Sequence, residues 1–388
     1  MGNGTPVADI RLAGLDFLQQ IEPVHDIFGI HLFREIFQER FQLCLCYLHS
    51  CPQGIIFGYY NRAYCMFKIK SPYIKVKRKI GKALLSLLAV YVFAHLAFVP
   101  IISILSRSSH GSKDTPARWQ LPYEPLIVKN SMGIKYPGWF IPGADHKPII
   151  IVLTGSGGNK FGSISRIVTR TLHDQGYAVF LFDTRGQGES PGIKTFGIGE
   201  ANDLAHAVDA LSRRYPGRKI GAVGFSLGAA TILRAAGMDE RLQAVAAYAS
   251  YSEIDNALIQ NELAVQLQGL CKRKGNPEFA SATPAIAEAI VSPLLTRLSL
   301  KIWSGTILPL PDPLESVTRM KGRSLLLMHN EGDPEIPLRH LERLKSAATG
   351  RCEVKIFPYA HHEPPLWDAS FKEGLGRTLV GFFARELG

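Results

Sequence analysis

Cysteine is scarce in this sequence, and the arrangements that bind metal ions are missing. There are six cysteines in 388 residues, and no two of them form a Cys-x-x-Cys pair. Cys44 and Cys46 stand without the second pair or the histidine cluster that a zinc site needs. We therefore expect no metal site, and the chemistry predicted below needs no organic cofactor. Internal repeats and low-complexity tracts are also absent, which excludes repeat and fibrous architectures.

Acidic residues are absent from the segment 66–82, which contains seven Lys and Arg residues. Much of the formal net charge of +11 is concentrated there. No motif of a nucleic-acid-binding module accompanies this charge, so we expect no nucleic-acid partner. The basic segment is followed by an uncharged apolar run, which makes anionic lipid headgroups the expected partner.

That apolar run, residues 83–105, is long enough to cross a hydrocarbon layer about 30 Å thick. The basic residues before it predict a cytoplasmic N-terminus, with the following domain on the opposite side of the membrane. A cleaved signal peptide is the alternative, although its apolar core would be unusually long. If the protein is soluble, the same apolar run would instead be a buried core helix.

The remaining segments complete the predicted domain organisation. Residues 1–65 form an N-terminal extension without a recognisable pattern, or Met66 is the true start of the chain. Residues 66–82 are a basic juxtamembrane segment, 83–105 a transmembrane helix, and 106–122 a linker. One large domain, residues 123–388, follows and is long enough for a single core.

The pentapeptide 224–228 reads Gly-Phe-Ser-Leu-Gly, with Ser226 at its centre. It lies between an apolar run typical of a strand and an alanine-rich run typical of a helix. Gly-x-Ser-x-Gly at a strand–helix turn is a nucleophile elbow, in which the flanking glycines let the strand and the helix approach each other. Ser226 is therefore the predicted nucleophile.

An acid and a base follow in the sequence, each just after a predicted strand. Asp333 follows the apolar run 324–329, with Glu331 as a rival acid, and the pair His361 and His362 follows the strand 354–357. A histidine can take the proton of a serine hydroxyl at neutral pH, and a carboxylate fixes its tautomer. The order Ser, Asp, His is that of α/β-hydrolases.

Further motifs support this lineage in sequence order. A strand and glycine-rich loop at 149–158, an Asp-x-Arg-Gly-x-Gly-x-Ser segment at 183–190, and an early strand at 138–142 all match. From about residue 123 onward the chain resembles the α/β-hydrolase superfamily, serine-hydrolase branch. The resemblance implies an α/β fold: a doubly wound, mostly parallel sheet with helices on both faces. The predicted fold class is therefore this α/β-hydrolase fold, preceded by one transmembrane helix.

The resemblance also assigns roles to residues. The N–H groups of Leu227 and Ser156 would form the oxyanion hole. Asp333 would be the acid and His362 the base, with His361 as the alternative base. The family often has His-Gly where this chain has Thr-Gly at 154–155, and the His-Gly-Gly-Gly form of many lipases is absent.

Residues 251–311 interrupt the alternation of strands and helices. Helical runs at 255–270 and 285–298 predict a helical cap inserted over the active site, which shapes acyl or leaving-group pockets. A surface excursion without a role in substrate binding is the alternative.

Together these features predict a membrane-anchored serine hydrolase. It would cleave small-molecule carboxylic esters or thioesters through an acyl-enzyme on Ser226. Esters are favoured over amides because an amine is a harder leaving group. The same triad also serves acyltransferases, peptidases and cofactor-free peroxidases, and a non-catalytic membrane-tethered scaffold is an alternative of another class.

Overall fold

The computed structural model describes residues 72–107, 115–254, 256–274, 276–304 and 311–388. The chain divides into two units, residues 1–85 and residues 86–388. All packing described below lies within the second unit. The predicted extension 1–65 and residues 66–71 of the basic segment lie outside the described residues.

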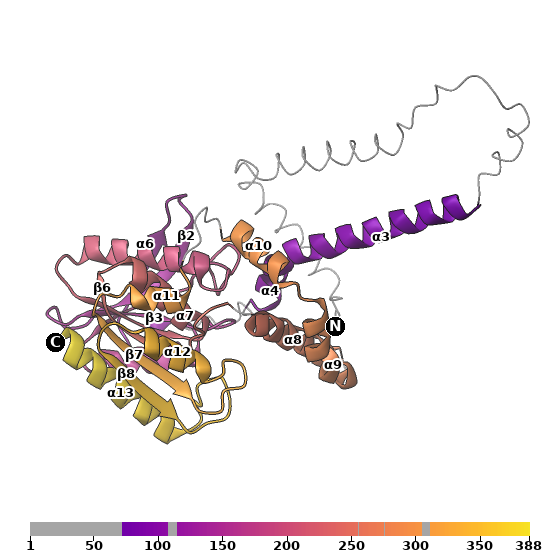
Figure 1. Ribbon diagram of the computed structural model, residues 1–388. Coiled ribbons are helices and arrows are strands. Elements are labelled where there is room, and N and C mark those ends of the chain that lie inside the picture. Colours follow the sequence, from indigo (N-terminus) through magenta and orange to yellow (C-terminus); the bar gives the residue numbers. More distant parts are fainter. Residues whose placement is uncertain (1–71, 108–114, 255, 275, 305–310) are drawn as a thin grey trace, which may run out of the picture. The chain divides into compact units, whose positions relative to one another are not determined.

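An eight-stranded sheet organises the large unit, in the spatial order β1-β2-β4-β3-β5-β6-β7-β8 (Figure 1). Strand β2 is antiparallel to both β1 and β4, and all other neighbours are parallel. The two early strands are thus antiparallel, as the sequence predicts. The strands are β1 Glu124–Lys129, β2 Lys135–Ile141, β3 Ile149–Leu153, β4 Ala178–Phe182, β5 Ile220–Phe225, β6 Leu242–Tyr248, β7 Ser324–Asn330 and β8 Cys352–Phe357.

Helices cover both faces of this sheet, which explains why its central strands are continuously apolar. All residues of β3, β4 and β5 are buried. One face packs against α5 Ser163–His173 and α13 Ala369–Leu387, beside the short helix η2 Pro116–Trp119. The other face packs against α6 Ile198–Arg214, α7 Leu227–Met238, α11 Pro313–Thr318 and α12 Arg339–Ala347. The doubly wound α/β-hydrolase fold is therefore confirmed.

Helices α8 Asn256–Arg273, α9 Pro277–Ile290 and α10 Pro293–Trp303 form the insertion after β6. Figure 1 shows α8 and α9 side by side, away from the helices that cover the sheet. A third apolar cluster joins α8 and α10 to Phe196, Tyr251 and Ile336 of the hydrolase core. The described part of the predicted insertion 251–311 thus consists of these three helices and short non-helical connections.

The apolar run at 83–105 differs from the single helix that the sequence predicts. Helix α3, Pro72–Leu96, ends before Ala97, and α4, Phe98–Leu105, begins directly after it. Val99 and Ile102 of α4 are fully buried, in the same cluster as the cap. The second half of the run is therefore part of the hydrolase unit. Length and hydropathy alone do not separate a helix that faces lipid from one that is buried in protein.

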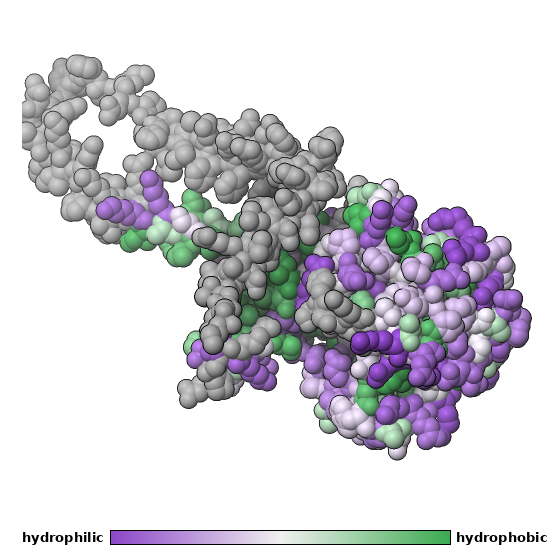
Figure 2. Space-filling model, turned by 180° about the vertical axis from the view of Figure 1, so that it is seen from behind, coloured by the Kyte–Doolittle hydropathy of each residue, from purple (hydrophilic) through white to green (hydrophobic). Residues whose placement is uncertain are grey.

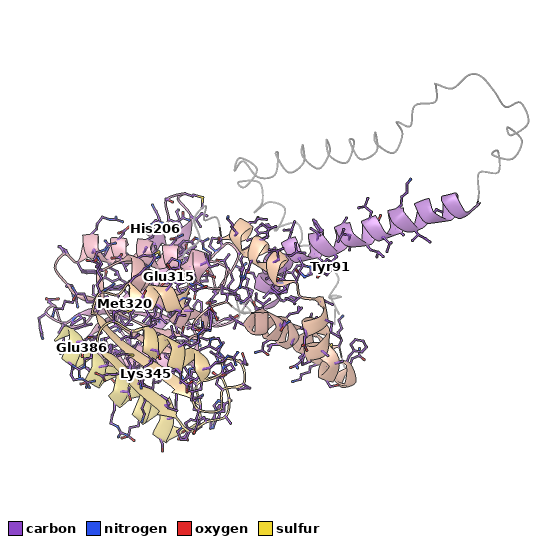
Figure 3. All side chains as sticks on the ribbon, in the orientation of Figure 1. Tyr91, His206, Glu315, Met320, Lys345 and Glu386 are labelled. Carbon is purple, nitrogen blue, oxygen red and sulfur yellow. The ribbon has the colours of Figure 1, made fainter. Side chains whose placement is uncertain are left out.

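One apolar window, Lys79–Leu96, has the length and mean hydropathy (1.5) of a membrane span, and only 6% of it is buried. Hydrophobic side chains dominate the visible surface of α3 in Figure 2. The C-terminal end of α3 forms hydrogen bonds with the cap helices α9 and α10. Tyr91, labelled in Figure 3, donates its hydroxyl to the Ile290 carbonyl at 3.3 Å. The Leu96 carbonyl accepts from Trp303 Nε1 at 2.8 Å.

Candidate active site

Ser226 sits on a sharp turn between β5 and α7, with the strained backbone angles φ 51° and ψ −115°. The turn is crowded on both sides. A Cβ on Gly224 would lie 2.4 Å from the Gly228 carbonyl oxygen, and a Cβ on Gly228 would lie 2.6 Å from that of Leu153. Only glycine fits at these two positions, which is the steric reason for the Gly-x-Ser-x-Gly pattern.

The structure brings the predicted nucleophile, base and acid together although they are far apart in the sequence. His362 Nε2 lies 2.8 Å from Ser226 Oγ. His362 Nδ1 lies 2.7 Å from Asp333 Oδ2. A carboxylate only accepts hydrogen bonds, so Nδ1–H donates to Asp333 and Nε2 accepts from the serine hydroxyl. This tautomer is the one in which histidine can take the proton of Ser226.

Asp333 is held in place by the backbone of its own loop. Its Oδ1 accepts from the N–H groups of Glu335 and Ile336, each at 2.9 Å. The side chain of Asp333 is fully buried. Glu331, the rival acid, is exposed. The loop thus leaves one oxygen of Asp333, Oδ2, for His362.

Burial and charge oppose each other in this pair. Burial raises the pKa of Asp333, but the hydrogen bond and charge of His362, together with the Ile336 N–H, lower it below 3.8 overall. Burial lowers the pKa of His362, but the hydrogen bond and charge of Asp333 raise it above 6.5 overall. The acid therefore stays ionised and stabilises the imidazolium form of the base.

His361 points into a different environment from that of its neighbour. Its Nδ1 lies 2.7 Å from the Glu363 carbonyl oxygen, and its ring packs against Tyr359 and Trp367. Asn330 donates to the His361 carbonyl at 2.7 Å and accepts from the Tyr248 hydroxyl at 2.7 Å. Asn330 and Tyr248 thus hold the loop that carries His362 in place, and neither was predicted from the sequence.

The two predicted oxyanion residues lie at the same cavity as the nucleophile. Ser156 and Leu227 line a space of about 40 Å³ together with Ser226 and His362. Leu227 is the first residue of α7, where backbone N–H groups have no carbonyl one turn earlier to donate to. A Cβ on Gly155 would lie 3.1 Å from the Ser226 Cβ, so the loop before Ser156 passes directly beside the nucleophile.

Other polar residues of this cavity were not identified from the sequence. Lys194, Asn261, Glu262 and Glu335 also line it. Their segments carry no motif, and only folding brings them beside Ser226. Within the described residues, no group of three or more His, Cys, Asp or Glu residues could hold a metal ion.

The sequence matches a model of a known protein family. The model described as serine aminopeptidase, S33, matches residues 144–366, which is more than half of the chain. The chain belongs to this family. The match contains Ser226, Asp333 and His362, and the protein is accordingly a serine hydrolase.

Two curated proteins are similar to parts of this chain at low sequence identity. The hydrolase is 26% identical to the uncharacterized protein YfhR of Escherichia coli over 260 residues, which are 64% of this chain and 75% of YfhR. It is 27% identical to protein phosphatase methylesterase 1 of Candida albicans over 111 residues. That match covers 28% of this chain and only 30% of the methylesterase.

Solved structures share the fold of the hydrolase at low sequence identity. An esterase from Pyrococcus furiosus aligns with a TM-score of 0.55 and 21% identity, over 73% of this chain and 97% of the esterase. The α/β hydrolase GrgF from a Penicillium species aligns with a TM-score of 0.52 and 18% identity, over 69% of this chain and 99% of GrgF. Both similarities concern the fold.

Proposed function

We propose that this protein is a membrane-anchored serine hydrolase that cleaves carboxylic esters or thioesters through an acyl-enzyme on Ser226. The observation that carries the catalytic part is the continuous hydrogen-bonded series from Ser226 Oγ through His362 to Asp333, at 2.8 and 2.7 Å. Each contact has the length and direction that proton transfer from the hydroxyl requires.

The reaction follows from this geometry. Ser226 Oγ attacks the carbonyl carbon while its proton passes to His362 Nε2. The negative charge on the carbonyl oxygen is stabilised by the N–H groups of Leu227 and Ser156. His362 then gives the proton to the departing alcohol or thiol, which leaves the acyl group on Ser226. A water molecule, deprotonated by His362, attacks the acyl carbon and releases the acid and the free serine.

A fluorophosphonate probe tests the catalytic part of the proposal. Such a probe forms a covalent bond only with an activated serine, so the wild type should be labelled and Ser226→Ala should not. Turnover of p-nitrophenyl esters of increasing chain length would then define the acyl preference. A folded wild type that neither reacts with the probe nor cleaves any ester would contradict catalysis and favour the scaffold alternative.

A peptidase is the second candidate, because the matching family model is described as serine aminopeptidase. The two functions differ in the leaving group that His362 must protonate. Aminoacyl p-nitroanilides and the corresponding p-nitrophenyl esters release the same kind of chromophore from an amide and an ester. A higher kcat/KM for the anilides would make the protein a peptidase instead of an esterase.

The proposed membrane anchor is the apolar window Lys79–Leu96. Seven Lys and Arg residues at 66–82 precede or overlap its start, and this charge supports a cytoplasmic N-terminus with the hydrolase domain across the membrane. Lipid through α3 and a small ester in the cavity are the proposed partners. A C-terminal reporter active only on the far side of the membrane would support this orientation, and a cytoplasmic signal would reverse it.

A further inference from the structure

Lys194 has a position in the active site for which the triad gives no reason. It lies in the loop between β4 and α6, and its side chain lines the cavity over Ser226. The residue is 3% exposed. A lysine is seldom buried so completely unless its ammonium group has partners.

The partners of Lys194 come from two segments that are distant in the sequence. Its backbone N–H donates to Ser103 Oγ at 2.7 Å, and its Nζ donates to Ser106 Oγ. Both serines belong to α4 or follow it directly. Nζ also donates to Ser156 Oγ, on the loop that supplies the second oxyanion N–H. Lys194 therefore connects the end of α4 to the oxyanion loop.

The α4 side of this connection is firmly placed. The Ser106 hydroxyl donates to the Ile102 carbonyl at 2.6 Å, which leaves its lone pairs free to accept from Lys194. Ile102 is fully buried, so this end of α4 is fixed by packing. A Cβ on Gly157 would lie 3.4 Å from the Ser106 carbonyl oxygen. The oxyanion loop thus lies directly against α4.

A second buried lysine shows how Lys194 differs from a purely structural one. Lys160 pairs with Asp183 at 2.8 Å and with Glu189 at 2.6 Å. In the described part of the chain, the Nζ of Lys194 bonds only to the two serine hydroxyls. Its positive charge is therefore not neutralised by direct contact with a carboxylate.

We propose that Lys194 is a positioning residue of the oxyanion hole. Its ammonium group, held by Ser106, orients Ser156 so that the backbone N–H faces the developing oxyanion, and places a positive charge on that side of the cavity. This inference rests on the proposed serine-hydrolase function. The proposed role of Lys194 also makes α4 part of the active site, although the sequence of α4 continues the apolar run of the proposed anchor.

The substitution Lys194→Met tests the inference in the full chain, kept in detergent. Methionine preserves the length of the side chain and removes the charge. Direct removal of an oxyanion donor costs about 10²- to 10³-fold in kcat, so loss of a positioning group should cost about 10- to 100-fold. KM should change by less than about two-fold, because the oxyanion forms only in the transition state.

The alkaline part of the pH profile gives a readout that a merely structural role would not change. Burial lowers the pKa of Lys194 below 10.5, although the negative charges of Glu262 on α8 and Glu200 on α6 act to raise it. The wild-type kcat should therefore fall as the pH rises through a value below 10.5, and Lys194→Met should lack this fall. The other titratable groups that line the cavity are Glu335, His362 and Tyr251, and burial raises the pKa of Tyr251 above its ordinary value.

Ser106→Ala provides a second, milder variant should Lys194→Met fail to fold. Alone, it should lower kcat several-fold. When Lys194→Met folds, adding Ser106→Ala to it should have no further effect, because the hydroxyl acts through Lys194. Lys219→Met, which removes an Nζ bonded to the Leu387 carbonyl, is the matched control and should keep kcat.

Unchanged kcat in Lys194→Met, or in Ser106→Ala when the first variant does not fold, would overturn the inference. So would an alkaline fall that persists without the lysine. These results concern only Lys194 as long as the wild type cleaves esters and Ser226→Ala does not. Absence of cleavage by the wild type itself would instead reject the proposed function.

Discussion

Replacing Asp333 with asparagine would isolate the effect of proton position on His362. The asparagine side-chain oxygen can keep the bonds from the N–H groups of Glu335 and Ile336, which Asp333 Oδ1 now accepts at 2.9 Å. Its NH₂ group would then face His362 Nδ1, which lies 2.7 Å from Asp333 Oδ2. An NH₂ group donates, so Nδ1 would have to accept and the ring proton would move to Nε2.

In that tautomer His362 cannot accept the proton of Ser226, although every heavy atom stays in place. The expected loss in kcat is about 10⁴-fold. This corresponds to about 5.4 kcal/mol of transition-state stabilisation, at about 1.36 kcal/mol for each factor of ten. KM should change little, because the change affects the transition state and leaves the cavity intact.

The assay is steady-state hydrolysis of a short p-nitrophenyl ester by the full chain in detergent, with thermal unfolding measured in parallel. Asp209→Asn is the matched control, because Asp209 pairs with Arg241 at a partly exposed site and should leave kcat unchanged. A folded Asp333→Asn protein that keeps more than about a tenth of the wild-type kcat would refute the assignment of Asp333 as the orienting acid.

Two further predictions concern the histidines. His362→Ala should lower ester turnover by about 10³-fold or more, whereas His361→Ala should leave it within about two-fold, because only His362 contacts Ser226; the reverse result in the same assay would make His361 the base. The acid limb of kcat/KM should have its midpoint above pH 6.5, because the folded pKa of His362 is raised and protonation removes the acceptor of the Ser226 proton. A wild-type midpoint at or below 6.5 would contradict this electrostatic account.

Local sequence patterns determined much of this protein. The glycines at 224 and 228 are fixed by contacts with backbone atoms a few residues away or on the adjacent strand, so the elbow at Ser226 can be recognised from five residues and their flanks. The continuous apolar runs predicted parallel strands covered on both sides, since a strand buried on both faces has no polar side. The same runs placed Asp333 and the pair His361 and His362 just after strands, and the family resemblance then assigned the roles of acid to Asp333 and base to His362.

Tertiary structure decided what depends on contacts between distant segments. His361 and His362 are adjacent and chemically identical, and the fold alone places one of them 2.8 Å from Ser226 Oγ. The apolar run at 83–105 has one uniform composition, yet α3 is largely exposed and α4 is buried against the cap. Hydropathy reflects how favourable it is to transfer a side chain out of water. It does not distinguish transfer into lipid from burial in protein. Likewise, Lys194 belongs to no motif, and only packing brings its ammonium group between Ser106 and Ser156.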